Sequence, residues 1–211
     1  MNSPRRIIVG VSGATGVIYA IRLLEVLRDL RIESHLVISK PGEMTLAYET
    51  NLVTRDLRAK ADFSYAIGDV GAAISSGSFR TMGMVVAPCS MRTVGEIAAC
   101  TSSNLLTRAA DVCLKERRRL VLMVRETPLH AGHLKAMLAA TEAGAIMFPP
   151  VPAFYARPQK LADVIDHSVA RTLDLFDIDA GLIDRWSGMA CRDDPTQVTA
   201  PSDSAFAKAS V

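Results

Sequence analysis

Apolar residues follow two different spacings along the chain. Short continuous runs of Val, Ile and Leu predict strands buried on both faces, whereas apolar residues three and four apart predict helices. The runs predict strands at residues 7–11, 34–38, 84–87, 120–124 and 145–148. The helical spacing covers residues 17–27, 42–51, 94–100, 103–117, 132–143 and 160–176. Their alternation indicates an α/β fold, a three-layer doubly wound parallel sheet with helices on both faces.

Less regular segments give further expectations. Residues 52–78 lack a clear period, although Asp69 is placed to cap a short helix that ends at residue 73. Pro88 is expected to stop the third strand, because proline has no N–H for a ladder bond. In the last helix we expect five apolar side chains to point inward: Leu161, Val164, Ile165, Val169 and Leu173.

A loop of small residues joins the first strand to the first helix. Gly10, Gly13 and Gly16 are spaced three apart, with Ser12 and Thr15 between them. Backbone N–H groups at a helix start, together with the helix dipole, favour a bound phosphate. Glycines allow its close approach, and the two hydroxyls are able to donate to it. The loop therefore predicts a phosphate site, with a purely structural glycine turn as the alternative.

The spacing narrows the choice of phosphate ligand. It differs from G-x-G-x-x-G, and no Gly-Lys-Ser/Thr ending marks a nucleoside triphosphate loop. The second strand ends at Ser39 and Lys40, where a dinucleotide site usually has an Asp or Glu for the ribose. A mononucleotide such as FMN fits better than NAD, although NADP tolerates a basic residue.

Composition bounds the class of protein. The chain has 211 residues, 49% hydrophobic and only 5% aromatic, so we expect a single domain with an aliphatic core. We place that domain at residues 1–186 and a C-terminal tail without periodicity at residues 187–211. A mean hydropathy of +0.21 favours apolar surface that a partner subunit covers.

Charge and cysteine usage argue against several partners. The formal net charge is only +2, and the basic run at residues 115–119 closes a helix, where cations complement the dipole, so no nucleic acid is expected. The four cysteines show no C-x-x-C spacing, which favours free thiols in a reducing cytoplasm. No apolar stretch reaches the ~20 residues of a bilayer span, so no membrane is expected.

Polar residues gather where the predicted strands end. In parallel α/β sheets, ligands bind beyond the carboxyl ends of the strands. Here those ends are residues 12–16, 39, 89–93 and 125–126.

Basic side chains elsewhere suggest a second anionic group near the first. Arg108 and Lys115 are seven residues apart on one face of a predicted helix, and Arg125 follows a predicted strand. Tyr155 lies in a proline-rich segment and Arg171 in the last helix. An ordinary surface helix with salt bridges explains the spacing equally well.

Six motifs, taken in order, resemble the UbiX/Pad flavin prenyltransferases. They are VSGATG at 11–16, SGSF at 76–79, PCSMRT at 88–93, RAADV and LKERR at 108–118, RETPL at 125–129 and PPVPAFY at 149–155. The resemblance implies a flavodoxin-like (Rossmann-like) fold, bound FMN, and transfer of a dimethylallyl group from dimethylallyl phosphate or diphosphate to N5 and C6 of reduced FMN. The prenylated FMN then serves a UbiD-type decarboxylase.

The resemblance also implies roles for single residues. FMN binding is implied for Gly13, Ala14, Thr15, Ser39, Ser90, Met91, Arg92, Thr93 and Arg125. Binding of the dimethylallyl phosphate is implied for Glu49, Arg108, Lys115, Tyr155 and Arg171. Catalytic roles fall to Glu49, Lys115 and Glu126, the last for proton transfer. No metal is required if these cations hold the phosphate. The family's sites lie between subunits of a homo-oligomer, commonly a dodecamer.

A few positions depart from the family pattern or suggest other chemistry. Thr15 stands where many members have Ser, and Val70 lies where some members place an aromatic against the prenyl group. His130 and His133 lack an H-E-x-x-H motif and a third ligand, so capping or interface roles are expected and no metal. His167 is expected to be a half-buried packing residue.

Three other functions stay open. Peptidyl-cysteine decarboxylases resemble this fold, but residues 88–91 do not supply their P-x-M-N-x-x-M-W motif. The second is direct decarboxylation of an aromatic acid by this chain alone. The third is a non-catalytic FMN carrier. Such a carrier would not need the side chains of Arg108, Lys115, Tyr155 and Arg171 to converge.

Overall fold

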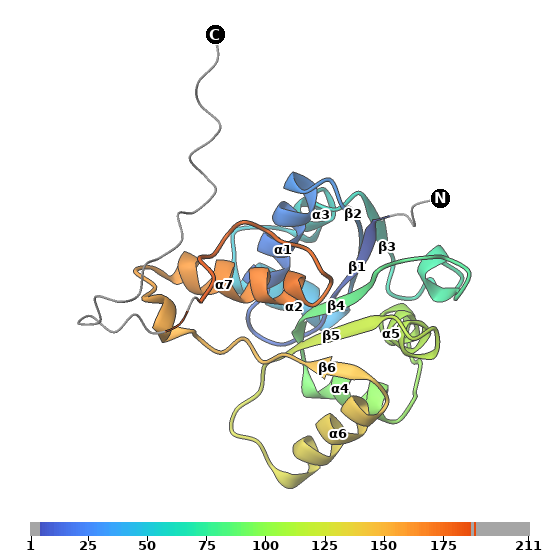
Figure 1. Cartoon of the computed structure of the whole chain (residues 1–211). Helices are drawn as coiled ribbons and strands as arrows, with labels where there is room; N and C mark the ends of the chain where they lie inside the picture. Colours follow the sequence, from blue (N-terminus) through green and yellow to red (C-terminus); the bar gives the residue numbers. More distant parts are fainter. Residues whose placement is uncertain (1–4, 187, 189–211) are drawn as a thin grey trace, which may run out of the picture.

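The computed structural model describes residues 5–186 and 188, which form a single parallel sheet with helices on both faces (Figure 1). The strand order is β3-β2-β1-β4-β5-β6. The strands are β1 (Arg6–Val11), β2 (Glu33–Ile38), β3 (Phe63–Tyr65), β4 (Gly83–Cys89), β5 (Arg119–Val124) and β6 (Ala145–Met147). The order changes direction between β1 and β4, the topological switch point where such sheets bind ligands. The predicted fold class is confirmed.

In the described residues, seven helices cover the sheet (Figure 1). One face carries α1 (Ile18–Asp29), α2 (Lys40–Glu49), α3 (Thr54–Arg58) and α7 (Leu161–Asp174). The other carries α4 (Met91–Ala98), α5 (Leu105–Lys115) and α6 (Ala131–Glu142). Two short 3-10 turns, η1 (Ala73–Ser75) and η2 (Phe154–Ala156), lie in the connections. Within the described part of the chain, no helix has both the length and the apolar character needed to cross a bilayer.

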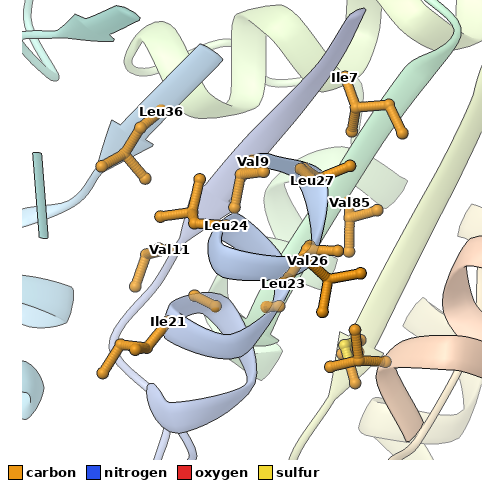
Figure 2. Close-up of a cluster of buried hydrophobic side chains, with 14 of the residues drawn as sticks. Ile7, Val9, Val11, Ile21, Leu23, Leu24, Val26, Leu27, Leu36 and Val85 are labelled. Carbon is orange, nitrogen blue, oxygen red and sulfur yellow. The ribbon is translucent and has the colours of Figure 1, made fainter. Parts of the chain in front are cut away.

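Strand β1 shows why the predicted strands are continuous apolar runs. Ile7, Val9 and Val11 belong to a buried cluster on the α1 face, and Ile8 belongs to a second cluster on the opposite face. Figure 2 shows the first cluster, with Leu24 of α1 among the side chains of β1. Because successive side chains point to opposite faces, a strand covered on both sides has no polar positions.

Two predictions between residues 52 and 90 are wrong. The helix expected from Asp69 is a series of turns followed by η1, and the short elements α3 and β3 lie where no period was visible. Pro88 does not stop the third strand, because β4 continues to Cys89 with a register shift after Val86. The shift removes the need for a ladder bond at Pro88, whose carbonyl accepts from the Ser12 N–H instead.

Three helices begin two or three residues away from the predicted start, because the capping residue differs. The side chains of Ser39 and Ser90 cap α2 and α4, which start two and three residues earlier than expected. Asn104, not Ser102 or Ser103, caps α5. The predicted FMN-binding residues that follow β4, Ser90 to Thr93, therefore form the N-cap and the first turn of α4.

The last helix largely matches its predicted inward face. Ile165, Val169 and Leu173 are buried in α7, and Val164 is half-buried. Leu161 is the exception, since it is 73% exposed in the first turn, before α7 reaches the core. The predicted tail at 187–211 lies outside the described residues, apart from residue 188.

Candidate active site

Backbone hydrogen bonds join the ends of four neighbouring strands at the carboxyl edge of the sheet. The N–H of Ser39, after β2, donates to the carbonyl of Val11 (2.9 Å), and the N–H of Ser12 donates to that of Pro88 (3.2 Å). The N–H of Arg125, after β5, donates to the carbonyl at the end of β4 (3.1 Å). The loops that carry the predicted FMN-binding residues are thus held together.

A cavity of about 330 Å³ opens at this edge, beside the switch point between β1 and β4. Predicted FMN-binding residues form part of its wall: Gly13, Ser39, Ser90, Arg92 and Thr93. Residues without an assigned FMN role complete it: Ser12, Lys40, Pro41, Ile67, Glu96, Asn104, Leu106 and Thr107. We call this space the switch-point cavity.

Close packing explains why the first loop consists of small residues. A Cβ atom at Gly13 would lie 2.3 Å from the Cβ of Pro41, in the first turn of α2. A Cβ at Gly42 would lie 2.8 Å from the carbonyl oxygen of Val11. The loop and the start of α2 are in direct contact, so no larger side chain fits between them.

The start of α4 carries the hydroxyl groups of the switch-point cavity. The Oγ of Ser90 accepts from the N–H of Thr93 (3.4 Å) and lies 3.2 Å from its Oγ1. Arg92, in the same turn, pairs with Glu96 (3.1 Å). Hydroxyls, backbone N–H groups and the positive end of a helix dipole together favour a phosphate here.

The start of α1, where the sequence predicted a phosphate, already holds a carboxylate. Both oxygens of Glu49 accept from the N–H of Gly16 (3.1 and 2.9 Å), and one also accepts from Val17 (3.1 Å). Glu49 therefore occupies the positive end of the α1 dipole. Glu49, which the resemblance assigns to the dimethylallyl phosphate, thus lies beside the first loop.

The Ser12 hydroxyl is not available to a phosphate, so that part of the prediction is wrong. Ser12 is 2% exposed. Its Oγ donates to the carbonyl of Pro88 (2.9 Å) and accepts from the N–H of Ser90 (2.7 Å). The single hydroxyl proton is committed inside the protein.

Other predicted FMN-binding residues lie around the same edge but not in the cavity wall. Ala14 and Met91 are buried, and Met91 packs in the apolar cluster on the α4 face of the sheet. Thr15, Arg125 and Glu126 are exposed. The extra methyl group of Thr15 therefore meets no crowding within the chain.

Tyr155 and Arg171 lie together at a second cavity of about 310 Å³, bordered by the proline-rich segment and α7. The hydroxyl of Tyr155 is 3.1 Å from Nε2 of His167, and its ring meets that of Trp186 edge-on at 5.5 Å. Burial, followed by the charge of Arg171, lowers the pKa of His167. His167 is half-buried, as predicted, and stays neutral at pH 7, able to accept from the tyrosine.

Arg108 and Lys115 lie on the other face of the sheet, on α5. Arg108 pairs with Asp111 (2.8 Å) and donates to the carbonyl of Ser75 (3.2 Å). Lys115, beside Glu116, ends the helix just before β5 starts, at the amino edge of the sheet. At 1.5 Å per residue, Lys115 is ~16 Å from the start of α5 that borders the switch-point cavity.

The predicted site is therefore assembled only in part within one chain. The FMN-binding loops converge, as expected. The donor-phosphate residues do not, because α5 and α7 cover opposite faces of the sheet.

Asn104 and Glu96 are cavity residues that the sequence analysis missed. Asn104 caps α5 by accepting from two backbone N–H groups (2.9 and 3.2 Å). Asparagine before an apolar helix is a capping signal, but Ser102 and Ser103 gave the same signal. Glu96 accepts from Arg92 and from the hydroxyl of Ser103 (2.6 Å), a pairing that spacing alone does not reveal.

Histidines and cysteines near the site have structural roles. Nδ1 of His130 accepts from the N–H of Gly132 (3.0 Å) and caps α6, as predicted. In the described residues, no three His, Cys, Asp or Glu side chains are grouped to hold a metal ion. Cys89, Cys100 and Cys113 are free thiols. Burial raises the pKa of Cys89, and that of Cys113 to about 12, so these two are not nucleophiles at pH 7.

Comparison with known proteins identifies the family of this chain. The family model described as Flavoprotein matches residues 1–173. The flavin prenyltransferase UbiX of Thauera aromatica is 55% identical over 183 residues, which cover 87% of this chain and 94% of that protein.

Two solved structures share the fold closely. AnUbiX in complex with FMN and dimethylallyl pyrophosphate is 52% identical, with a TM-score of 0.86, and the match covers 88% of this chain and 99% of that one. The dodecameric FMN-dependent UbiX-like decarboxylase of Escherichia coli O157:H7 is 48% identical, with a TM-score of 0.84 over 87% of this chain and all of that one. The Flavoprotein match over most of the chain and an identity of 55% to a flavin prenyltransferase lead to one assignment: this chain belongs to the UbiX family of flavin prenyltransferases.

Proposed function

We propose that this chain joins the dimethylallyl group of dimethylallyl phosphate or diphosphate to N5 and C6 of reduced FMN. The observation that carries the proposal is the switch-point cavity, formed by the loops after β1, β2 and β4 in a fold shared with a protein solved with FMN and dimethylallyl pyrophosphate.

The residues of the cavity fit FMN. The hydroxyls of Ser39, Ser90 and Thr93 and the backbone N–H groups at the start of α4 suit a phosphate, while Ile67 and Leu106 give the wall an apolar part. Reduced FMN supplies the nucleophilic N5 and C6. The remaining predicted contacts, the backbone of Gly13, Ala14, Thr15 and Met91 and the side chains of Arg92 and Arg125, complete the proposed flavin site.

The second part of the proposal concerns the prenyl donor. Departure of an allylic phosphate requires positive charge on the leaving oxygens. Arg108, Lys115 and Arg171 supply that charge and Tyr155 a hydroxyl, without a metal ion. Arg108 and Lys115 lie on the opposite face of the sheet from Tyr155 and Arg171 in one chain. We therefore propose that neighbouring copies in a homo-oligomer, of the dodecameric kind seen in the Escherichia coli protein, bring the two pairs to the flavin.

Two carboxylates are proposed to handle protons. Glu126 follows Arg125 at the end of β5, and Glu49 adjoins the loop after β1. Both lie at the carboxyl edge, and we propose that one of them takes up the proton that N5 loses as its bond to the dimethylallyl group forms and the phosphate leaves. Closing the bond to C6 gives one proton to the double bond of that group and removes one from C6, so this step needs no net proton. The surrounding apolar walls keep water from the allylic cation.

The product is proposed to pass to a UbiD-type decarboxylase. Three free thiols in the described residues support a reducing compartment, and we propose the cytoplasm.

One experiment tests the function. The protein is incubated anaerobically with reduced FMN and with either dimethylallyl phosphate or diphosphate, and the flavin is analysed by mass spectrometry and added to an inactive UbiD-type decarboxylase. We expect a flavin heavier by one dimethylallyl unit that activates the decarboxylase. An unchanged flavin mass with both donors would refute the proposal and favour an FMN carrier. Decarboxylation of an aromatic acid by this protein alone would favour the direct decarboxylase named in the sequence analysis.

A further inference from the structure

We infer that Ser12 is a positioning residue, whose buried hydroxyl holds the first turn of α4 in the place where it binds the flavin phosphate. This inference rests on the proposed function, because it assigns a role at the same site. Ser12 lies at the end of β1 and Ser90 at the end of β4, so the bond between them spans the switch point.

The first step of the argument is the unusual end of β4. The register shift after Val86 and the missing N–H of Pro88 interrupt the ladder between strands there. The Pro88 carbonyl accepts from both the N–H and the Oγ of Ser12 (3.2 and 2.9 Å). Ser12, the residue directly after β1, therefore replaces the ladder bonds that β4 lacks at its end.

The second step links this bond to the cavity. The same Oγ accepts from the N–H of Ser90 at 2.7 Å, and Ser90 Oγ in turn meets Thr93 Oγ1 at 3.2 Å. The Ser12 hydroxyl thus holds the backbone of Ser90, whose side chain reaches Thr93 in the cavity wall. Ser12 has no free proton for a ligand, so it acts through the position of Ser90.

The third step concerns what is lost without the hydroxyl. In Ser12→Ala the N–H of Ser90 loses its acceptor in a buried place, and the turn must move to find another. Such a shift changes the geometry at the phosphate but leaves the apolar wall in place. FMN and riboflavin differ only by the phosphate, so the ratio of their dissociation constants isolates this effect.

Ser34 offers a matched control. It is 1% exposed, its Oγ donates to Asp62 (2.9 Å), and it accepts from the Asp62 N–H (3.0 Å). Its burial and its bonds therefore resemble those of Ser12. Ser34 lies near the start of β2, at the opposite edge of the sheet from the cavity.

The experiment measures dissociation constants for oxidised FMN and riboflavin by flavin fluorescence, with the thermal midpoint of each full-length variant. We expect Ser12→Ala to reduce the preference for FMN over riboflavin about tenfold, which corresponds to the net free energy of a single hydrogen bond. Ser12→Cys keeps a weak donor and should lie between wild type and Ala, which keeps the test usable if Ser12→Ala does not fold. Ser34→Ala should lower the thermal midpoint and preserve the preference.

The outcomes separate the two proposals. An unchanged FMN preference in both Ser12 variants, or an equal loss of both flavins, would overturn the positioning role and leave the proposed function standing. A wild-type protein that binds no FMN would overturn the proposed function, and the positioning role with it.

Discussion

At the scale of single residues, the carboxylate of Glu49 takes the place that a helix start offers to an anion. It comes from the end of α2 and accepts from the N–H groups of Gly16 and Val17. It therefore stabilises the loop after β1, beside the proposed flavin site, while remaining exposed at the carboxyl edge.

Replacing Glu49 should separate its charge from its hydrogen bonds. We expect Glu49→Ala to lower the free energy of unfolding by about 1 kcal/mol, as for the loss of an N-cap, and Glu49→Gln to lower it less, because the amide oxygen still accepts. Urea titration measures both. Glu142, the exposed last residue of α6, is the control, and Glu142→Ala should change stability by less than about 0.5 kcal/mol. Equal losses in all three variants would contradict the capping role.

Substitution of two basic residues should affect the rate of prenyl transfer and the affinity for FMN separately. We expect Lys115→Ala to slow prenyl transfer about 100-fold with little change in FMN affinity, because it removes charge at the leaving phosphate. Arg125→Ala should weaken FMN binding about tenfold, by loss of a charge-assisted bond. Single-turnover rates and flavin titrations give the two numbers. Lys135→Ala, at an exposed position of α6, is the control and should change neither value. If Lys115→Ala weakened FMN binding and Arg125→Ala slowed prenyl transfer, the two assignments would have to be exchanged.

At the scale of elements, the edge formed by β2 and β3 is held by a buried histidine. His35, 2% exposed, is 2.7 Å from Glu33 and 2.9 Å from the hydroxyl of Tyr65, and its ring stacks on Phe63. Burial lowers its pKa below the usual 6.5, against the opposing effect of Glu33. Arg6 adds to the lowering and Asp62 opposes it.

This histidine makes stability depend on pH. The unfolded chain binds a proton at His35 below pH 6.5, whereas the folded protein binds it only at lower pH. Folding stability due to His35 is therefore complete above pH 6.5 and is lost as the pH falls toward the folded pKa. We expect the free energy of unfolding to decrease between pH 7.5 and 5.5, and His35→Gln to reduce that decrease. An identical pH dependence in the variant would show that other groups cause it.

Elements with a local signal were predictable from the sequence, and elements that depend on distant contacts were not. The long strands and helices follow from apolar periods, but β3 has three residues and α3 has five, too few to show one. Helix starts depend on which of several capping residues is used, as at Asn104. The converging loops follow from topology, whereas the Glu49 bonds join residues 33 apart in the chain.

At the scale of the whole molecule, exposed apolar side chains mark surfaces of α2 and α6. Met44 and Tyr48 are 73% and 93% exposed, and Leu134 and Leu138 are 55% and 59% exposed. Each pair is four residues apart and so forms a patch on one side of its helix. These patches agree with the sequence-based expectation of partner subunits.

The proposed assembly of the site from several copies is tested by complementation. Lys115→Ala and Arg171→Ala should each transfer the prenyl group slowly when expressed alone, but co-expressed and purified as mixed assemblies they should regain faster transfer. Some sites then take both wild-type side chains, one from each kind of copy. Separately purified variants, mixed without subunit exchange, are the control. No recovery in mixed assemblies would mean that both residues of a site come from one copy.

The contact between Gly13 and Pro41 constrains how this chain is able to evolve. Any residue but glycine at position 41 brings a Cβ atom to the same point, 2.3 Å from a Cβ at position 13. A substitution at position 13 therefore requires glycine at position 41 or a shift of one backbone segment, whereas position 41 is free of this restriction as long as position 13 stays glycine. This restriction comes from the packing of two backbone segments, so it should persist in descendants that have lost the flavin altogether.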